Sequence, residues 1–172
     1  MIEISGIFSL DRIGYGVHAS SKKRAIELLS KLIANGTESD LNSTEVFDCL
    51  FARERLGSTG LGAGVAIPHG RFPNLNRTIC AFLRLKEPVR FDAQDDQPVD
   101  LLLGLLVPEN CTDEHLQILS TLTKKFSDAS FREKFRVPKV SPDMLYALLT
   151  ETLSAAQSPQ ASSSKTEPPP DR

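Results

Sequence analysis

The feature that most constrains the fold is an aliphatic stretch near residue 100. Between Leu101 and Val107 every side chain is aliphatic except at Gly104, and Val99 extends the pattern. Such a run is typical of a strand buried on both faces of a sheet, and it is far too short to span a membrane. The rest of the chain must therefore supply layers that cover a sheet on both sides.

Helix and strand patterns alternate around this stretch. A serine or asparagine N-cap, an apolar stripe at helical spacing and a glycine or proline boundary define most of the expected helices. These are a helix from Ser20 or Ser21 to about Asn35, one from Asn42 or Ser43 to just before Gly57, one over Thr112–Phe126, and one from Pro142 to about Leu153. Residues 78–85 and 99–107 are expected to form strands. The pattern predicts an α/β domain but not its strand order.

The last nineteen residues differ sharply in composition from the rest. They contain five serines and four prolines and no large apolar side chain. Such a segment buries too little surface to offset its ordering entropy. We expect one domain over residues 1–153 and a disordered Ser/Pro-rich tail over residues 154–172.

Charge and cysteine content restrict the class of protein further. The formal net charge is −2, so the composition indicates no nucleic-acid partner. The N-terminus lacks the pattern of a secretory signal, and the three cysteines are interpreted as reduced thiols. We therefore expect a cytoplasmic protein without direct membrane insertion. The histidine spacing predicts no metal site.

The stretch from Arg53 to Arg71 contains most of the candidate functional residues. Four glycines fall within eight residues, at 57, 60, 62 and 64, with Ser58 and Thr59 among them. A glycine-rich loop with hydroxyl groups suits a phosphate, because backbone N–H and side-chain O–H donors converge closely. The spacing is neither that of a P-loop nor that of a dinucleotide fingerprint. The alternative is a long turn between a helix and a strand.

His69 follows this loop within the sequence Pro68-His69-Gly70. Proline fixes its own backbone and glycine leaves room beside the ring, so the imidazole can be held rigidly towards a partner. A histidine with a pKa of about 6.5 is mostly uncharged at pH 7 and is then a competent nucleophile. The alternative from pattern alone is an ordinary turn residue.

The string GSTGLGAGVAIPHGR, preceded by Arg53-Glu54, resembles the active-site signature of the mannitol/fructose-class IIA proteins of the phosphotransferase system. Within that family it looks most like the nitrogen-regulatory branch, IIA-Ntr. Three flanking segments agree: SKKRAIELLSKL, FDAQDDQPVDLLLGLLVP and EHLQILSTL. The resemblance covers nearly everything from Leu10 to Leu153.

The resemblance implies a fold and a phosphoacceptor. The fold is a mixed five-stranded sheet flanked by helices on both faces. His69 accepts a phosphoryl group, as a tele-phosphohistidine, from a small HPr-like phosphocarrier (NPr in the nitrogen-related system). Arg53 and His115 lie beside it as catalytic partners. No cofactor and no metal is expected.

The residue types suit these roles. A guanidinium at Arg53 can contact phosphate oxygens with a fork that lysine lacks, although by pattern alone Arg53 belongs to a solvated charged run. His115 lies in the first turn of a helix, where an anion is favoured; the alternative is a partly exposed histidine. Ser58, Thr59 and Gly60 are expected to bind the phosphate. His18 has no assigned role, and Asp92, Asp95 and Asp96 are interpreted as a polar turn.

Two functions that use a phosphohistidine remain open at this point. The first is a regulatory phosphoprotein whose phosphorylation state changes which proteins it binds; the resemblance suggests potassium-transport or sensor-kinase components as partners. The second is a sugar-specific IIA component that passes phosphate to a IIB domain in fructose- or mannitol-type uptake. In either case the chain is a phosphotransferase component with a phosphohistidine intermediate. A plain interaction module remains if His69 is unreactive.

Overall fold

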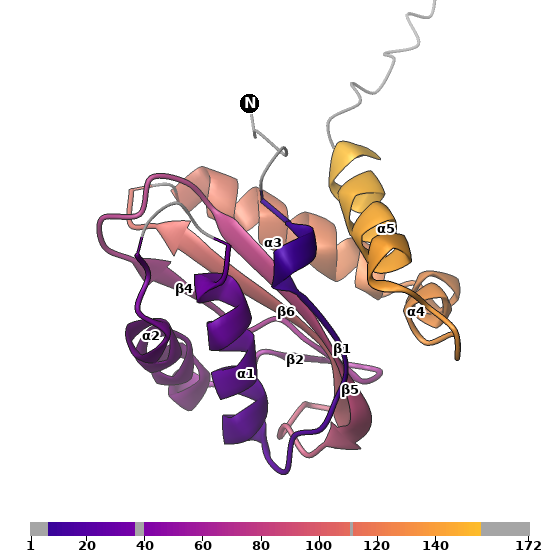
Figure 1. Ribbon diagram of the computed structural model, residues 1–172. Helices are drawn as coiled ribbons and strands as arrows, with labels where there is room; N and C mark the ends of the chain where they lie inside the picture. Colours follow the sequence, from indigo (N-terminus) through magenta and orange to yellow (C-terminus); the bar gives the residue numbers. More distant parts are fainter. Residues whose placement is uncertain (1–6, 37–39, 111, 156–172) are drawn as a thin grey trace, which may run out of the picture.

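A computed structural model describes residues 7–36, 40–110 and 112–155 (Figure 1). Six strands form one mixed sheet in the order β1-β5-β6-β3-β2, and β4 also pairs with β6. The strands are β1 (Ile13–Val17), β2 (Gly60–Gly62), β3 (Val65–Ala66), β4 (His69–Phe72), β5 (Ile79–Val89) and β6 (Val99–Pro108). The aliphatic stretch forms β6, which lies at the centre and pairs with three strands. The expected central strand is confirmed.

The sheet has six strands, whereas the resemblance implied five. β3 and β4 run parallel to β6 in a single register, since Val65 is opposite Leu101 and His69 is opposite Leu105. They therefore occupy one position in the sheet, interrupted at residues 67 and 68. Five positions and six strands describe the same architecture.

In the described part of the chain, five α-helices pack on this sheet. They are α1 (Lys22–Ala34), α2 (Ser43–Leu56), α3 (Thr112–Phe126), α4 (Ala129–Phe135) and α5 (Pro142–Ala155), and a 3-10 turn, η1 (Leu10–Arg12), precedes β1. The predicted N-caps are confirmed: Ser21 Oγ accepts from the Arg24 N–H at 3.1 Å, and Asn42 Oδ1 from the Thr44 N–H at 2.8 Å. Helix α4 is absent from the prediction, and α5 extends two residues past the predicted domain boundary.

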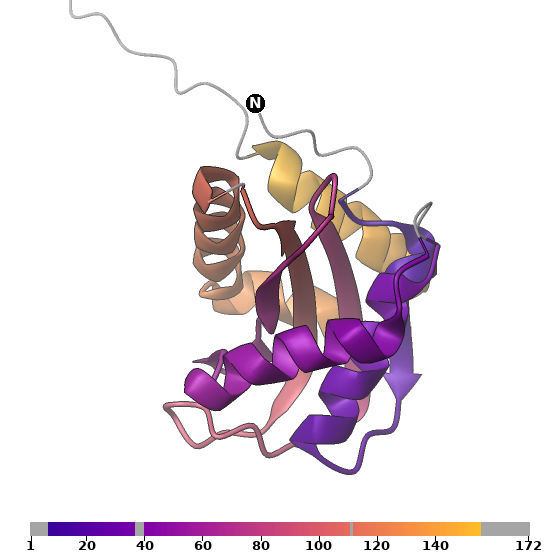
Figure 2. The ribbon, with the colours of Figure 1, turned by 90° about the vertical axis from the view of Figure 1, so that its left-hand side faces the viewer.

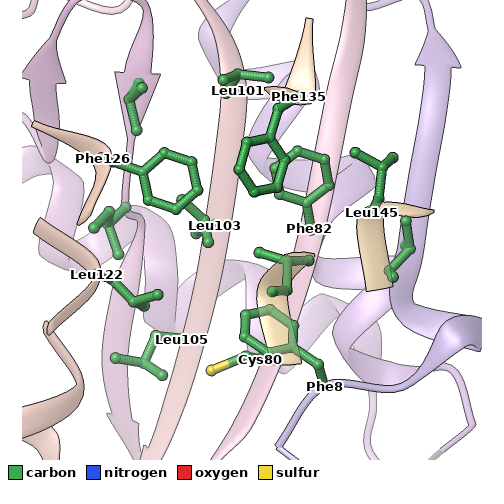
Figure 3. Packing of buried hydrophobic residues seen from close by; sticks show 14 of the residues in the cluster. Phe8, Cys80, Phe82, Leu101, Leu103, Leu105, Leu122, Phe126, Phe135 and Leu145 are labelled. Carbon is green, nitrogen blue, oxygen red and sulfur yellow. The ribbon is translucent and has the colours of Figure 1, made fainter. Parts of the chain in front are cut away.

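The helices form a layer on each side of the sheet, which confirms the predicted class. Figures 1 and 2 show α1 and α2 over one face and α3, α4 and α5 over the other. Alternate residues of β6 supply the two cores: Leu101, Leu103 and Leu105 face α3 to α5, and Leu102 and Leu106 face α1 and α2. Figure 3 shows the first core, where Phe82, Phe126 and Phe135 pack together.

Two turns hold the start of β3 in place. Gly64 has φ of +81°, and a Cβ there would collide with the Arg136 guanidinium, so glycine is required. Arg136 bridges Asp100 at 2.7 Å and the Ala63 carbonyl at 2.8 Å. The Asp95 carboxylate accepts from the Ala63 and Gln97 N–H groups, which lowers the pKa of Asp95 and agrees with the predicted polar turn.

Other parts of the prediction differ in detail or lie outside the described residues. β5 extends to Val89, four residues past its predicted end. His18 follows β1 as an exposed residue 3.9 Å from Glu87. Ser154 and Ala155, the first two residues of the tail expected over 154–172, belong to α5, so that part of the prediction is wrong. Residues 156–172 lie outside the described part of the chain, so their disorder stays a prediction.

Candidate phosphoacceptor site

Three elements converge around His69. His69 is the first residue of β4, Arg53 lies in the last turn of α2, and His115 lies in the first turns of α3. Val65 and Ile67 point into the core beneath α3. Since side chains alternate along a strand and the register is continuous, His69 points to that same side. The strand thus directs the imidazole towards α3 and away from α1.

One hydrogen bond fixes the ring of His69. Its Nδ1 lies 2.8 Å from the carbonyl oxygen of Ile67. A carbonyl oxygen only accepts, so Nδ1 carries the hydrogen and donates it. The lone pair of the neutral ring is then on Nε2. This is the tautomer required of a nucleophile that reacts at Nε2.

The surroundings keep His69 uncharged. Burial lowers its pKa most, and the positive charge of Arg53 lowers it further, against the Ile67 hydrogen bond and Glu54, which raise it. The net pKa lies below the ordinary value of about 6.5. A histidine in this state is a nucleophile at neutral pH.

His115 is the second imidazole of the site. The two ring centroids are 5.3 Å apart and the ring planes meet at 78°. His115 is only 7% exposed, and within the described residues neither of its ring nitrogens has a hydrogen-bond partner. Burial, His69 and Arg71 lower its pKa to about 4. A buried polar group without a partner costs free energy, so this ring is poised to accept one.

Two arginines supply positive charge. Arg53 acts on the pKa of His69 and donates to the Gly57 carbonyl at 2.9 Å. Arg71 is exposed and acts on the pKa of His115. Arg71 was part of the predicted motif but had no assigned role, although its position two residues after His69 on a strand places both side chains on one face. Arg55 is exposed and lies over the Phe51 ring, 5.8 Å from its centroid.

The donors of the glycine-rich loop are engaged within the protein. The Thr59 hydroxyl and N–H both donate to Glu54. The Ser58 hydroxyl donates to the Phe91 carbonyl at 2.9 Å and accepts from the Gly60 N–H at 3.1 Å. These contacts hold the loop against its neighbours. Phosphate binding by Ser58, Thr59 and Gly60 stays a prediction.

Exposed leucines occur on the elements that carry the site. Leu56, at the end of α2, is 85% exposed, and Leu116, next to His115, is 60% exposed. Leu61 of β2 is also exposed. Leu56 and Leu116 lie on the helices that also carry Arg53 and His115.

The described residues, 7–36, 40–110 and 112–155, lack both a metal-binding cluster and a membrane-spanning helix. Across those ranges, no group of three or more His, Cys, Asp or Glu side chains is placed to hold a metal ion. In the same part of the chain, none of the helices combines the length and hydropathy needed to cross a membrane.

Comparison with known proteins defines the family. Residues 6–151 match the model for the EIIA 2 component of the phosphoenolpyruvate-dependent sugar phosphotransferase system. A nitrogen regulatory protein of Klebsiella oxytoca is 40% identical over 87% of this chain and 91% of its own. The crystal structure of IIA-Ntr from Neisseria meningitidis superposes with a TM-score of 0.79 at 49% identity, covering 85% of this chain and 98% of that one.

A third match is the IIA-mannitol protein of Escherichia coli, solved in complex with phosphorylated enzyme IIB-mannitol. It has a TM-score of 0.65 at 25% identity, covering 84% of this chain and 97% of the other. The chain belongs to the EIIA type-2 family of the phosphotransferase system. As the resemblance implied, the relatives include nitrogen regulatory proteins.

Proposed function

We propose that His69 accepts a phosphoryl group on Nε2 from an HPr-like phosphocarrier. The observation that carries the proposal is the hydrogen bond from Nδ1 to the Ile67 carbonyl, which leaves the lone pair on Nε2. The lowered pKa of His69 supports it, because the ring is uncharged at neutral pH. Family membership makes phosphotransfer the expected chemistry.

The transfer forms one bond to phosphorus and breaks another. Nε2 forms a bond to phosphorus as the bond from phosphorus to the donor's histidine breaks, and the proton of His69 stays on Nδ1. The transition state is loose, so positioning and charge stabilisation dominate. Arg53 supplies a planar guanidinium for the equatorial oxygens. His115 supplies an N–H donor that gains a phosphate oxygen as its partner, since its ring nitrogens are unpartnered within the described residues.

Phosphorylation changes the charge at His69, which is half-buried at the start of β4. A phosphohistidine adds negative charge comparable to that of other phosphorylated side chains. The exposed Leu56 and Leu116, on the helices that carry Arg53 and His115, are our candidates for the apolar part of a contact with protein partners. This supports a cytoplasmic regulatory protein whose binding to its targets depends on the state of His69. Potassium-transport or sensor-kinase components are the candidate targets.

The second candidate is a sugar-specific IIA component that passes its phosphate to a IIB domain. The similarity to IIA-mannitol, solved with phosphorylated IIB, favours it. The nitrogen regulatory relatives are more similar, at 40% and 49% identity against 25%. We therefore place the regulatory function first.

A deletion strain separates the two functions. If the protein is a regulator, the strain grows normally on fructose and mannitol but misregulates ion or nitrogen physiology. A chromosomal His69→Ala allele should then differ from the deletion, because the unphosphorylated protein still binds its targets. A growth defect restricted to one sugar, equal in the deletion and the His69→Ala allele, would establish the sugar carrier instead.

A further inference from the structure

A buried ion pair lies behind the phosphoacceptor loop. Glu54 Oε1 is 2.7 Å from Lys22 Nζ, and the two side chains are 1% and 20% exposed. Both oxygens of Glu54 also accept from the Thr59 N–H at 3.1 Å. A carboxylate buried this deeply is tolerated only when its charge and lone pairs are satisfied. Here one cation and one threonine satisfy them.

The ion pair joins four separate segments of the chain. Lys22 begins α1, Glu54 lies in the last turn of α2, and Thr59 lies in the glycine-rich loop. Lys22 also donates to the Phe91 carbonyl at 3.2 Å, and its Nζ lies 4.7 Å from the centre of the Phe91 ring. Ser58 donates to that same carbonyl. The glycine-rich loop is thereby held by Glu54 through Thr59 and by the Phe91 carbonyl through Ser58.

One backbone–backbone hydrogen bond and one hydrogen bond from the His69 side chain connect Thr59 to the imidazole. The Thr59 carbonyl accepts from the Ile67 N–H at 3.0 Å. The Ile67 carbonyl accepts from His69 Nδ1 at 2.8 Å. The N–H and the carbonyl of Ile67 lie in adjacent peptide groups joined at its Cα, so a shift of Thr59 that displaces residue 67 also displaces the carbonyl that orients the ring. Glu54 is thus linked to His69 through hydrogen bonds without touching it.

We propose that Glu54, with Lys22 as its counter-ion, is a positioning residue that holds His69 in the Nδ1–H tautomer with Nε2 free to react. Its consequence for phosphotransfer rests on the function proposed above. The tautomer itself is a property of the unphosphorylated protein and is measured without any donor. A role confined to stability would leave the tautomer unchanged.

The variants separate positioning from stability. Removing one member leaves the other charge buried and unpaired, whereas replacing both with apolar residues of similar size is often neutral or stabilising. The pair Lys22→Met/Glu54→Leu should therefore fold, yet it lacks the carboxylate that holds Thr59. Glu54→Gln keeps one acceptor and serves as the conservative variant. Lys23→Met/Asp48→Asn is the matched control, because it removes one exposed charge from each of the same helices.

The measurement is the ¹⁵N spectrum of the His69 ring at neutral pH, followed by the rate of phosphorylation by a purified HPr-like carrier. We expect one tautomer in the wild type and the control. We expect a mixture in Lys22→Met/Glu54→Leu, with transfer slower by about tenfold to a hundredfold, the scale of a misplaced reactive group. Glu54→Gln should lie in between, and it decides the case if the double variant does not fold.

The outcomes are distinguishable. A folded double variant with a single Nδ1–H tautomer and unchanged transfer overturns the positioning role and leaves the proposed function intact. A tautomer mixture in the variant, with no phosphorylation of the wild type, supports positioning and overturns the proposed function. Equal loss in the Lys23→Met/Asp48→Asn control would overturn the assignment of the effect to this ion pair.

Discussion

At the scale of single residues, the site depends on two imidazoles that stay uncharged near neutral pH. Burial is the first cause in both. For His115 the nearby His69 and Arg71 add to it, and the pKa falls to about 4. A histidine whose pKa is lower in the folded state than in the unfolded state destabilises the fold when the pH decreases.

The first prediction is the pH dependence that follows. Between the unfolded pKa of about 6.5 and the folded value of about 4, the unfolded state binds the proton and the folded state does not. The stability from this group is complete above 6.5 and is lost as the pH falls towards 4. The free energy of unfolding should therefore fall more steeply in the wild type than in His115→Gln, by up to about 1.4 kcal/mol per pH unit. The free energy of unfolding is measured by urea titration at several pH values. An equal pH dependence in the wild type and His115→Gln would contradict the burial of a neutral His115.

The second prediction concerns Arg53. Arg53→Lys keeps the charge but loses the planar fork, so phosphotransfer to His69 should slow by about tenfold while the thermal midpoint stays near that of the wild type. Arg55→Lys, on the same turn but exposed, is the matched control and should transfer normally. Equal transfer rates for the two variants would show that Arg53 has no role in phosphotransfer and is an ordinary surface residue. The transfer rates are measured with the purified carrier in quenched time-course assays.

The sequence predicted some of these residues and missed others for a physical reason. His69, Arg53 and His115 were named from a motif and a resemblance. Glu54 stands next to Arg53 and looks like one more member of a charged run. Its burial depends on Lys22, which is distant in sequence, and no local pattern reports such a pairing. The same holds for the engaged hydroxyls of Ser58 and Thr59.

At the scale of elements, the position of His69 depends on how closely α2 packs against β4. Gly70 is directly opposite Cys49, where a Cβ would lie 2.6 Å from Sγ. Cys49 Sγ also donates to the Arg71 carbonyl at 3.2 Å. The absence of a side chain at residue 70 lets the helix that carries Arg53 approach the strand that carries His69.

The third prediction tests this approach. Gly70→Ala should push α2 from β4, cost about 1–3 kcal/mol of stability and slow phosphotransfer. Adding Cys49→Ala removes the sulfur that the new methyl group meets, so the double variant should recover most of both losses. The measurements are denaturant unfolding and the transfer rate. Recovery of neither in the double variant would show that another contact, not Cys49, requires glycine.

The long elements were predictable and the short ones were not. The capped helices α1 and α2 and the strand β6 carry complete periodic signals. β2 and β3 have only three and two residues, and they lie in a stretch so rich in glycine that it indicates a loop. Pairing with β6 makes this stretch part of the sheet, and only tertiary structure supplies that partner. Helix α4, with seven residues, is likewise too short for a helical period.

At the scale of the whole molecule, two cores share one sheet, and the site lies where the layers meet. α2 packs on β4 from one face, and on the other face His115 of α3 lies against His69 of β4. The aliphatic composition of β6 predicted both layers, since a strand buried on both faces needs both. The strand order could not be predicted, because it depends on pairings between distant segments.

The fourth prediction concerns the end of the chain. Truncation after Ala155, where α5 ends, should leave the thermal midpoint and the phosphorylation rate nearly unchanged. The reason is compositional, because residues 156–172 include no large apolar side chain that would add to a core. Differential scanning calorimetry of the full and truncated chains provides the measurement. A midpoint lowered by many degrees would show that the segment packs on the domain.

The atom of His69 that is phosphorylated decides whether this site works as proposed. The protein is incubated with phosphoenolpyruvate and purified phosphotransferase carriers, and the product is examined by ³¹P and ¹⁵N spectroscopy. Since Nδ1 donates to Ile67, we expect one phosphoryl group, on Nε2 of His69, and none in His69→Ala. Phosphate on Nδ1, on another residue, or retained by folded His69→Ala would contradict it.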